Sequence, residues 1–136
     1  MSKIKFEITN NKVGCLIYTD LKTIKRDQIY EIKNLLNNYG VLFFKNQNLS
    51  PSEYIKFSAN FGIPAKYPML KPHNDFKDIY VIERKKTDTG KSVEEGPQTH
   101  YSYLENPPRC TFLQALDLPE VGNGNTLFYN QFLAYE

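Results

Sequence analysis

The sequence has no tryptophan, two cysteines, two histidines and no apolar stretch long enough to cross a bilayer. So few histidines exclude a site built from three of them, and the cysteines form no zinc-binding pattern. The first residues lack the apolar core of a secretory signal, so we expect a cytoplasmic protein. Because Cys15 and Cys110 are far apart in the sequence, we expect them to be buried thiols rather than a disulfide. A net charge of only +2 argues against nucleic acid or a membrane surface as the main partner.

Three widespread catalytic motifs are also missing. The sequence has no G-x-S-x-G nucleophile elbow, no glycine-rich phosphate-binding loop and no H-E-x-x-H zinc motif. Motifs therefore give no support to a hydrolase, a nucleotide-binding protein or a metalloprotease.

The composition that is present is that of an ordinary globular domain of 136 residues, with 40% hydrophobic and 14% aromatic side chains. Alternation and turn residues predict two short strands between residues 4 and 18. Apolar residues at three- and four-residue steps predict a helix over residues 23–39, which Gly40 ends. The apolar run at residues 41–44 predicts a central strand that is covered on both faces.

A second helix is predicted to begin at Ser50, where Pro51 and Glu53 complete a capping box, and to end near Phe61. Its aromatic face is expected in the core. The remaining predicted elements are a loop over 63–76, strands over 78–83, 111–116 and 126–129, a polar excursion over 85–97 and a final helix capped by Asn130.

The segment with the most chemical information is Gly-Pro-Gln-Thr-His-Tyr-Ser-Tyr-Leu-Glu-Asn-Pro-Pro, residues 96–108. It resembles the iron-binding segment of the taurine dioxygenase (TauD/TfdA) family of Fe(II)- and 2-oxoglutarate-dependent dioxygenases. The family pattern there is Gly-Trp-His-Thr-Asp, a small residue, Ser or Thr, an aromatic residue, and commonly Leu-Glu-x-Pro-Pro.

Further blocks resemble the same family in the same order, so the resemblance covers nearly the whole chain. They are Val13-Gly14, Asp20-Leu21, Tyr-Gly-Val-Leu-Phe-Phe-Lys-Asn-Gln at residues 39–47, Phe61-Gly62, Leu-Pro-Glu-Val-Gly-Asn-Gly-Asn-Thr-Leu-Phe at residues 118–128, and Ala-Tyr-Glu at residues 134–136.

The resemblance implies an α+β fold, namely a partial double-stranded β-helix (jelly roll) with amino-terminal helices packed on the sheet. It also implies a single, truncated domain over residues 1–136. In the family, a His-x-Asp pair and a distal His hold Fe(II) by one face and leave positions for 2-oxoglutarate and O2. The implied reaction is oxidation of a small organic acid coupled to decarboxylation of 2-oxoglutarate.

Aligned through residues 104–108, the family's Trp-His-x-Asp falls on Pro97, Gln98, Thr99 and His100. Gln98 and His100 are therefore the candidate metal ligands, and no residue is assigned a catalytic role. An amide oxygen is a weaker ligand than imidazole, and a histidine in place of the aspartate removes the anionic charge.

Two further site residues follow from the resemblance. Thr126 matches the family threonine that helps to bind the carboxylate of 2-oxoglutarate, although a β-branched residue that opens a strand is the plain alternative. Tyr67 resembles a position near the substrate pocket, although it is equally consistent with a tyrosine packed over the loop.

A second set of ligands is open within the same chain, because His73 and Asp75 form their own His-x-Asp pair, which His100 would complete. These residues lie in turn-forming sequence, where a site would be poorly preorganised, so we expect His73 to be an exposed loop histidine.

Three functional hypotheses remain. The chain is a fragment or inactive remnant of a dioxygenase, one half of a split dioxygenase with an atypical metal site, or a non-enzymatic binding or assembly module. Half a jelly roll leaves open strand edges and an uncovered core face, so we expect self-association or a complementing chain.

Overall fold

The computed structural model describes residues 3–10, 13–68, 70–85, 87–89, 96–120 and 124–135. The chain divides into two compact units. Unit 1 comprises Met1–Leu49 and Leu113–Glu136, and unit 2 comprises Ser50–Phe112. Among the described residues, no helix is both long enough and apolar enough to cross a membrane.

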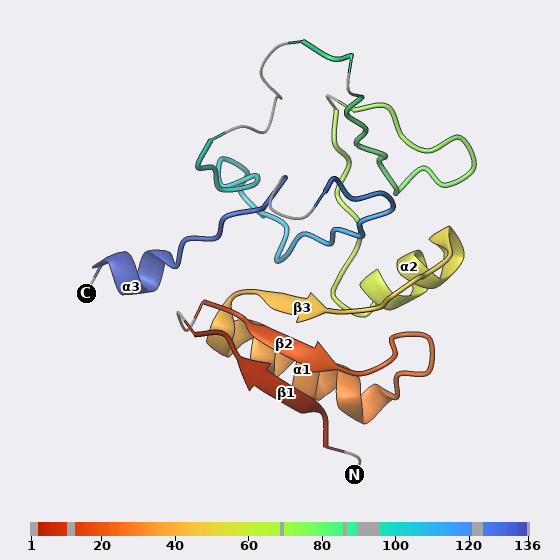
Figure 1. The fold of residues 1–136 in the computed structure, drawn as a ribbon. Helices are drawn as coiled ribbons and strands as arrows, with labels where there is room; N and C mark the ends of the chain where they lie inside the picture. Colours follow the sequence, from red (N-terminus) through yellow and green to blue (C-terminus); the bar gives the residue numbers. More distant parts are fainter. Residues whose placement is uncertain are drawn as a thin grey trace. The chain divides into compact units, whose positions relative to one another are not determined.

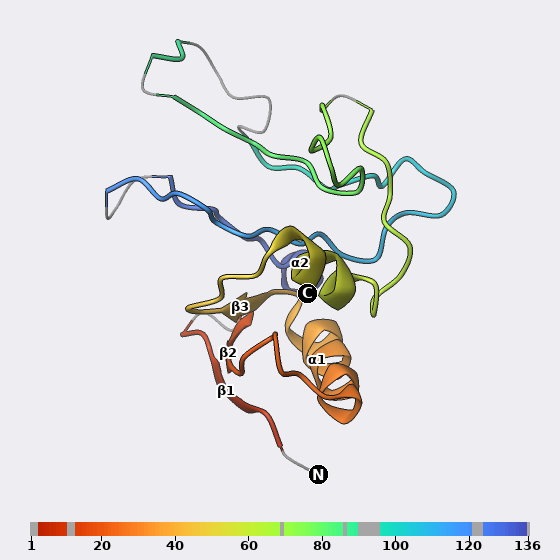
Figure 2. The same ribbon diagram turned by 90° about the vertical axis from the view of Figure 1, so that its right-hand side faces the viewer.

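Unit 1 contains a three-stranded mixed sheet with the order β1-β2-β3. Strand β1 (Lys5–Ile8) pairs antiparallel with β2 (Cys15–Tyr18), which confirms the two predicted strands. Strand β3 (Leu42–Phe44) lies parallel to β2, and helix α1 (Arg26–Tyr39) connects them while covering one face of the sheet (Figures 1 and 2).

The predicted central position of β3 is wrong. Strand β2 occupies the centre, and β3 forms an edge with half-buried residues. The α1 crossover returns the chain beside β2, and no other strand among the described residues pairs with the far side of β3. An apolar run alone therefore did not distinguish a central strand from an edge strand.

Helix α1 has the buried face that its periodicity predicts, with Ile29, Ile32 and Leu35 in the core. Gly40 ends it with a φ of 74° and donates its N–H to the Leu36 carbonyl at 2.8 Å. The helix begins at Arg26, three residues later than predicted. Residues 20–23 instead form a turn, because the Lys22 N–H donates to the Asp20 carboxylate at 2.9 Å.

The core of unit 1 is small and almost wholly aliphatic. It consists of Ile4, Cys15, Ile17, Leu21, Ile29, Ile32, Leu35 and Leu49. Cys15 is completely buried, and burial raises the pKa of its thiol. Both cysteines are thiols, as predicted, but Cys110 is half-buried rather than buried.

Two glutamine side chains connect distant parts of unit 1. Gln47 donates to the carbonyls of Thr19 (3.0 Å) and Lys45 (2.9 Å) and accepts the Leu21 N–H at 3.1 Å. The amide of Gln114 bonds both backbone groups of Leu49: Oε1 accepts the N–H at 3.3 Å and Nε2 donates to the carbonyl at 3.0 Å. The sequence analysis assigned a structural role to neither residue.

Unit 2 opens with helix α2 (Pro51–Ser58), whose capping box is confirmed. The Ser50 N–H donates to the Glu53 carboxylate at 2.7 Å, and the Ser50 hydroxyl accepts the Glu53 N–H at 3.4 Å. The helix ends before Phe61, because the N–H groups of Asn60 and Phe61 bond carbonyls three residues back and tighten the last turn.

The aromatic face of α2 packs within unit 2, as predicted. The ring of Phe112 packs against three rings of this face, with centroid distances of 5.8 Å to Phe57, 5.1 Å to Phe61 and 6.5 Å to Tyr54. These edge-on contacts form the core of unit 2. The Tyr54 hydroxyl also donates to the Phe112 carbonyl at 2.7 Å.

The three later strands are a correction to the sequence analysis. At residues 78–83 the structure has only a bridge between Pro72 and Tyr80, and residues 111–116 and 126–129 belong to no strand. A strand forms only where a partner completes a ladder of hydrogen bonds, and among the described residues these three segments form no ladder beyond the single bridge at Tyr80. The fold described is therefore a small mixed sheet with few helices.

The final predicted helix is confirmed as α3 (Gln131–Tyr135). The Asn130 side chain caps it by accepting the N–H groups of Phe132 at 3.0 Å and Leu133 at 3.2 Å. The predicted polar excursion over residues 85–97 lies largely outside the described residues.

Candidate functional site

Residues 96–108 cross unit 2 as an irregular segment without helix or strand. Gly96 opens it with a φ of 127°, a conformation that suits glycine. The hydroxyl groups of Thr99 and Ser102 bond each other at 3.0 Å, and the Leu104 N–H donates to the Tyr101 carbonyl at 3.0 Å. The segment is therefore a sequence of turns held by its own polar groups.

Gln98 and His100, the candidate metal ligands, are both exposed on this segment. One offers an amide oxygen and the other an imidazole nitrogen, so neither carries a negative charge at neutral pH. Among the described residues, no three histidine, cysteine, aspartate or glutamate side chains lie together. The described side chains thus do not provide the two imidazoles and one carboxylate that hold Fe(II) in this kind of site.

The alternative set of His73, Asp75 and His100 is not assembled either. His73 Nδ1 accepts the Asp75 N–H at 3.1 Å, and its ring packs against Phe76 with the centroids 5.4 Å apart. The His73 N–H donates to the Ile79 carbonyl at 2.7 Å. His73 is therefore half-buried and structural, which corrects the expectation of an exposed loop histidine.

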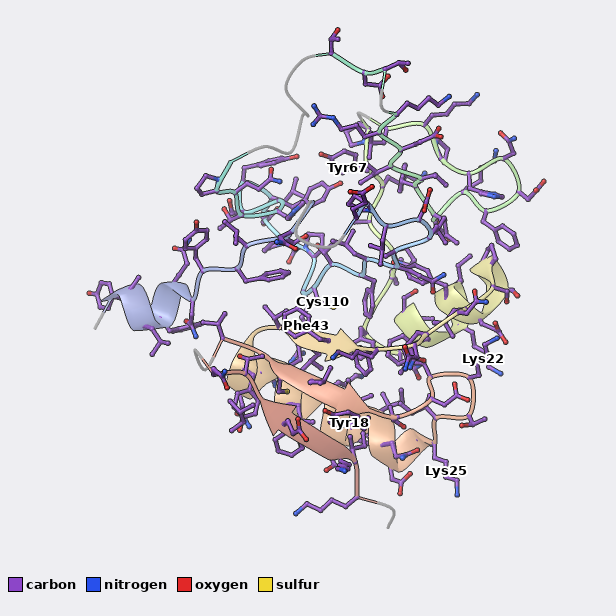
Figure 3. The ribbon with its side chains drawn as sticks, in the orientation of Figure 1. Tyr18, Lys22, Lys25, Phe43, Tyr67 and Cys110 are labelled. Carbon is purple, nitrogen blue, oxygen red and sulfur yellow. The ribbon has the colours of Figure 1, made fainter. Side chains whose placement is uncertain are left out.

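Tyr67, labelled in Figure 3, is half-buried in a group of tyrosines within unit 2. Its ring lies 5.6 Å from that of Tyr101 and 6.1 Å from that of Tyr80, both edge-on. The Tyr67 N–H also donates to the Tyr80 hydroxyl oxygen at 2.9 Å. These are the contacts of a tyrosine packed over the loop, which was the plain alternative for Tyr67.

Tyr101 is the residue in this region that the sequence analysis did not single out. Its hydroxyl donates to the Lys66 carbonyl at 3.4 Å, and its ring also contacts Tyr103, with centroids 6.1 Å apart. Desolvation, followed by the proximity of Tyr67, Tyr103 and Tyr80, raises the pKa of its phenol. Its place directly after His100 in a tyrosine-rich stretch was the available sequence signal.

Thr126, the candidate 2-oxoglutarate residue, belongs to unit 1, whereas Gln98, His100 and Tyr67 belong to unit 2. Its side chain is exposed in an extended stretch. Two residues later, Phe128 packs edge-on against Phe43, which Figure 3 labels at strand β3, with 5.7 Å between ring centroids. This contact holds the stretch that carries Thr126 within unit 1.

Comparison with known proteins gives one family. The model of the family described as taurine catabolism dioxygenase TauD, TfdA family matches residues 13–136. Among curated relatives, pentalenolactone F synthase of Streptomyces avermitilis is 30% identical over 122 residues, and that of Streptomyces arenae is 27% identical over 118. These matches cover 84% and 82% of this chain, respectively. They cover 40% of each relative, so the chain corresponds to less than half of their length.

A solved structure agrees with these matches. It is a protein from Burkholderia xenovorans assigned as an alpha-ketoglutarate-dependent taurine dioxygenase, with 26% identity and a TM-score of 0.53. The superposition covers 60% of this chain and 32% of that one. The family match extends over most of the sequence and includes the segment with Gln98 and His100. The chain therefore belongs to the TauD/TfdA family of dioxygenases.

Proposed function

We propose that this chain is the amino-terminal part of a 2-oxoglutarate-dependent dioxygenase of the TauD/TfdA type and is inactive by itself. The complete domain would form the jelly roll and oxidise a small organic acid while 2-oxoglutarate loses CO2 and becomes succinate. The observation that carries the proposal is the family match over residues 13–136, in a chain that covers 40% of its curated relatives.

The ligand segment supports the inactivity of the isolated chain. Fe(II) activates O2 in this family, and its facial site requires an anionic ligand to hold the metal well. Gln98 and His100 are two neutral donors on an exposed segment, and no described carboxylate joins them. Two exposed neutral ligands bind a divalent metal weakly, because they offset little of the cost of removing its water.

The remaining site residues are proposed in the same sense. Thr126 would contact the distal carboxylate of 2-oxoglutarate through its hydroxyl, which is exposed and available as a donor. Tyr67 would border the substrate, although its ring already packs on Tyr80 and Tyr101. A phenol held in this way is a rigid wall for a small ligand rather than a mobile ligand-binding group.

The test is to incubate the purified chain with Fe(II), ascorbate and 2-oxoglutarate and to measure succinate. We expect no succinate above the metal-free control from the unmodified chain. Succinate produced by the chain alone, and lost in His100→Ala, would overturn its inactivity and favour a working but atypical site.

A second measurement addresses the size of the natural protein. The intact mass of the natural gene product should exceed the 15.8 kDa of this chain if the chain is part of a longer enzyme. A mass equal to 15.8 kDa would contradict this form of the proposal and leave an inactive remnant or one half of a split enzyme.

A second candidate function, a self-assembly module, is favoured by the apolar surface of unit 1. Five large apolar side chains on stretches that form no strand are each more than two-thirds exposed: Leu113, Leu116, Leu118, Leu127 and Phe132. We propose that a second copy of the chain covers these residues, because every copy presents the same surface. Sedimentation equilibrium should give a dimer, independent of iron and 2-oxoglutarate; a strict monomer would contradict this candidate.

A further inference from the structure

Tyr101 has a backbone conformation that a large side chain rarely adopts. Its φ is +56°, in the left-handed region, where only Tyr101 and Asn46 among the described non-glycine residues are found. Asparagine tolerates this region because its side chain bonds the local backbone, whereas an aromatic residue is strained there. Such strain persists only where surrounding contacts overdetermine the conformation.

Besides its contact with Tyr103, Tyr101 is held by contacts from outside its own segment. Its ring lies edge-on to Tyr67, 5.6 Å away, and its hydroxyl donates to the Lys66 carbonyl. Tyr67 is fixed in turn, because its N–H bonds the Tyr80 hydroxyl and Tyr80 forms a bridge with Pro72. Tyr101 thus connects the segment after His100 to a braced loop within unit 2.

The strained residue also sets the direction of the chain on both sides. The Tyr101 carbonyl accepts the Leu104 N–H, and one residue before it the chain carries the exposed imidazole of His100. A change of φ at Tyr101 rotates the preceding peptides relative to the braced loop, and with them Gln98 and His100.

We propose that Tyr101 is a positioning residue: its ring, held by Tyr67, keeps the segment with Gln98 and His100 in a fixed orientation without help from a bound metal. The importance of that orientation rests on the proposed function, in which this segment is the ligand segment. The positioning itself depends only on the contacts of Tyr101.

The first test separates the ring from the backbone. Tyr101→Asn tolerates the left-handed conformation but removes the ring, Tyr101→Phe keeps the ring but removes the hydroxyl, and Tyr129→Asn is the control at an exposed tyrosine of unit 1. Hydrogen exchange of the Leu104 amide should quicken about tenfold or more in Tyr101→Asn and stay within about twofold in the other two. Unchanged exchange in Tyr101→Asn would overturn the proposal.

The second test asks whether the orientation serves ligands. Gln98→His with His100→Asp restores the family's donors, and Mn²⁺ should then broaden the amide signals of residues 98–102. Adding Tyr101→Asn should weaken Mn²⁺ binding about tenfold, whereas adding Tyr101→Phe should change it less than threefold. Equal Mn²⁺ affinity with and without the ring would overturn a positioning role toward ligands.

The two tests fail in different ways. If the restored donors bind no Mn²⁺ but Leu104 exchange still depends on the ring, the assignment of residues 96–108 as a ligand segment is wrong and the positioning by Tyr101 stands. If Mn²⁺ binds with the same affinity with and without the Tyr101 ring, the proposed ligand segment is supported and the positioning role of Tyr101 toward ligands is lost.

Discussion

At the scale of single residues, Gly14 shows how close packing determines which side chain a position accepts. Its φ is +95°, and a Cβ added there would lie 2.8 Å from the Val41 carbonyl oxygen and 2.9 Å from the Phe43 ring. Both the backbone conformation and the available space therefore require glycine. Gly14 directly precedes β2 and Val41 directly precedes β3, so this close contact lies where the two strands begin.

We predict that Gly14→Ala lowers the free energy of unfolding by about 2–3 kcal/mol, since it adds both strain and overlap. Gly40→Ala is the matched control, because Gly40 also has positive φ but an added Cβ would meet nothing within 4 Å. It should cost about 1 kcal/mol. Urea unfolding measures both; equal losses at the two glycines would show that the space around Gly14 is irrelevant.

Tyr54 gives a prediction that depends on pH. Burial raises the pKa of its phenol from 10.0 to about 12, and its hydroxyl donates to the Phe112 carbonyl. Because the folded state favours the protonated phenol, this contribution to stability is complete below pH 10 and is lost as the pH rises towards 12.

Tyr54→Phe should therefore lower the free energy of unfolding by about 1 kcal/mol at neutral pH, through loss of the hydrogen bond. The difference between the two proteins should shrink in alkaline urea titrations. Tyr30→Phe, on the exposed side of α1, is the control and should be neutral. A difference that stays constant with pH would contradict the titration of Tyr54.

At the scale of elements, the glutamine side chains replace backbone pairing that the strands do not provide. Gln114 bonds both polar groups of the Leu49 peptide backbone, and Leu49 is only 6% exposed. An amide side chain is suited to this because it carries one acceptor and two donors in a plane. Residues 113–114 are thus attached to the segment that follows β3, without forming a ladder.

We predict that Gln114→Ala lowers the free energy of unfolding by about 1–3 kcal/mol, because both Leu49 groups lose their partners in a buried position. Exchange of the Leu49 amide should quicken in parallel. Gln131→Ala, at an exposed position of α3, should change neither quantity. Unaltered Leu49 exchange in Gln114→Ala would mean that another group satisfies this peptide.

At the scale of the whole molecule, many large apolar side chains are exposed beside two small cores. Among the described residues, nine form the buried hydrophobic core, whereas the leucines at 113, 116, 118 and 127 are each at least 72% exposed. Such area in water favours association with another chain. This is the physical link between the limited sheet of unit 1 and the assembly that we propose.

We predict that Leu127→Ser combined with Phe132→Ser shifts any dimer towards monomer by about tenfold or more in dissociation constant, because two large apolar contacts are lost. Sedimentation velocity over a range of concentrations measures the shift. Tyr30→Ser, which removes an exposed aromatic residue from α1, should leave the equilibrium unchanged. An equal shift in all variants would point to nonspecific association.

The sequence by itself determined the elements whose causes are local. Residues close together in the chain determine helix α1 and its end at Gly40, the helix caps at Ser50 and Asn130, and the hairpin of β1 and β2. The same holds for family membership, because short motifs in a fixed order suffice to establish it.

Only the tertiary structure decided the features that depend on distant partners. It placed β2 rather than β3 at the centre of the sheet, left residues 78–83, 111–116 and 126–129 without ladders, and packed Tyr67 on Tyr101. Strand pairing and side-chain packing both need a second segment at the right distance. Alternation and apolar runs in a sequence indicate only that a segment could pair with such a partner, not which partner it has. For the same reason, the sequence indicated Gln98 and His100 as candidate ligands but did not indicate Tyr101, which we propose orients them.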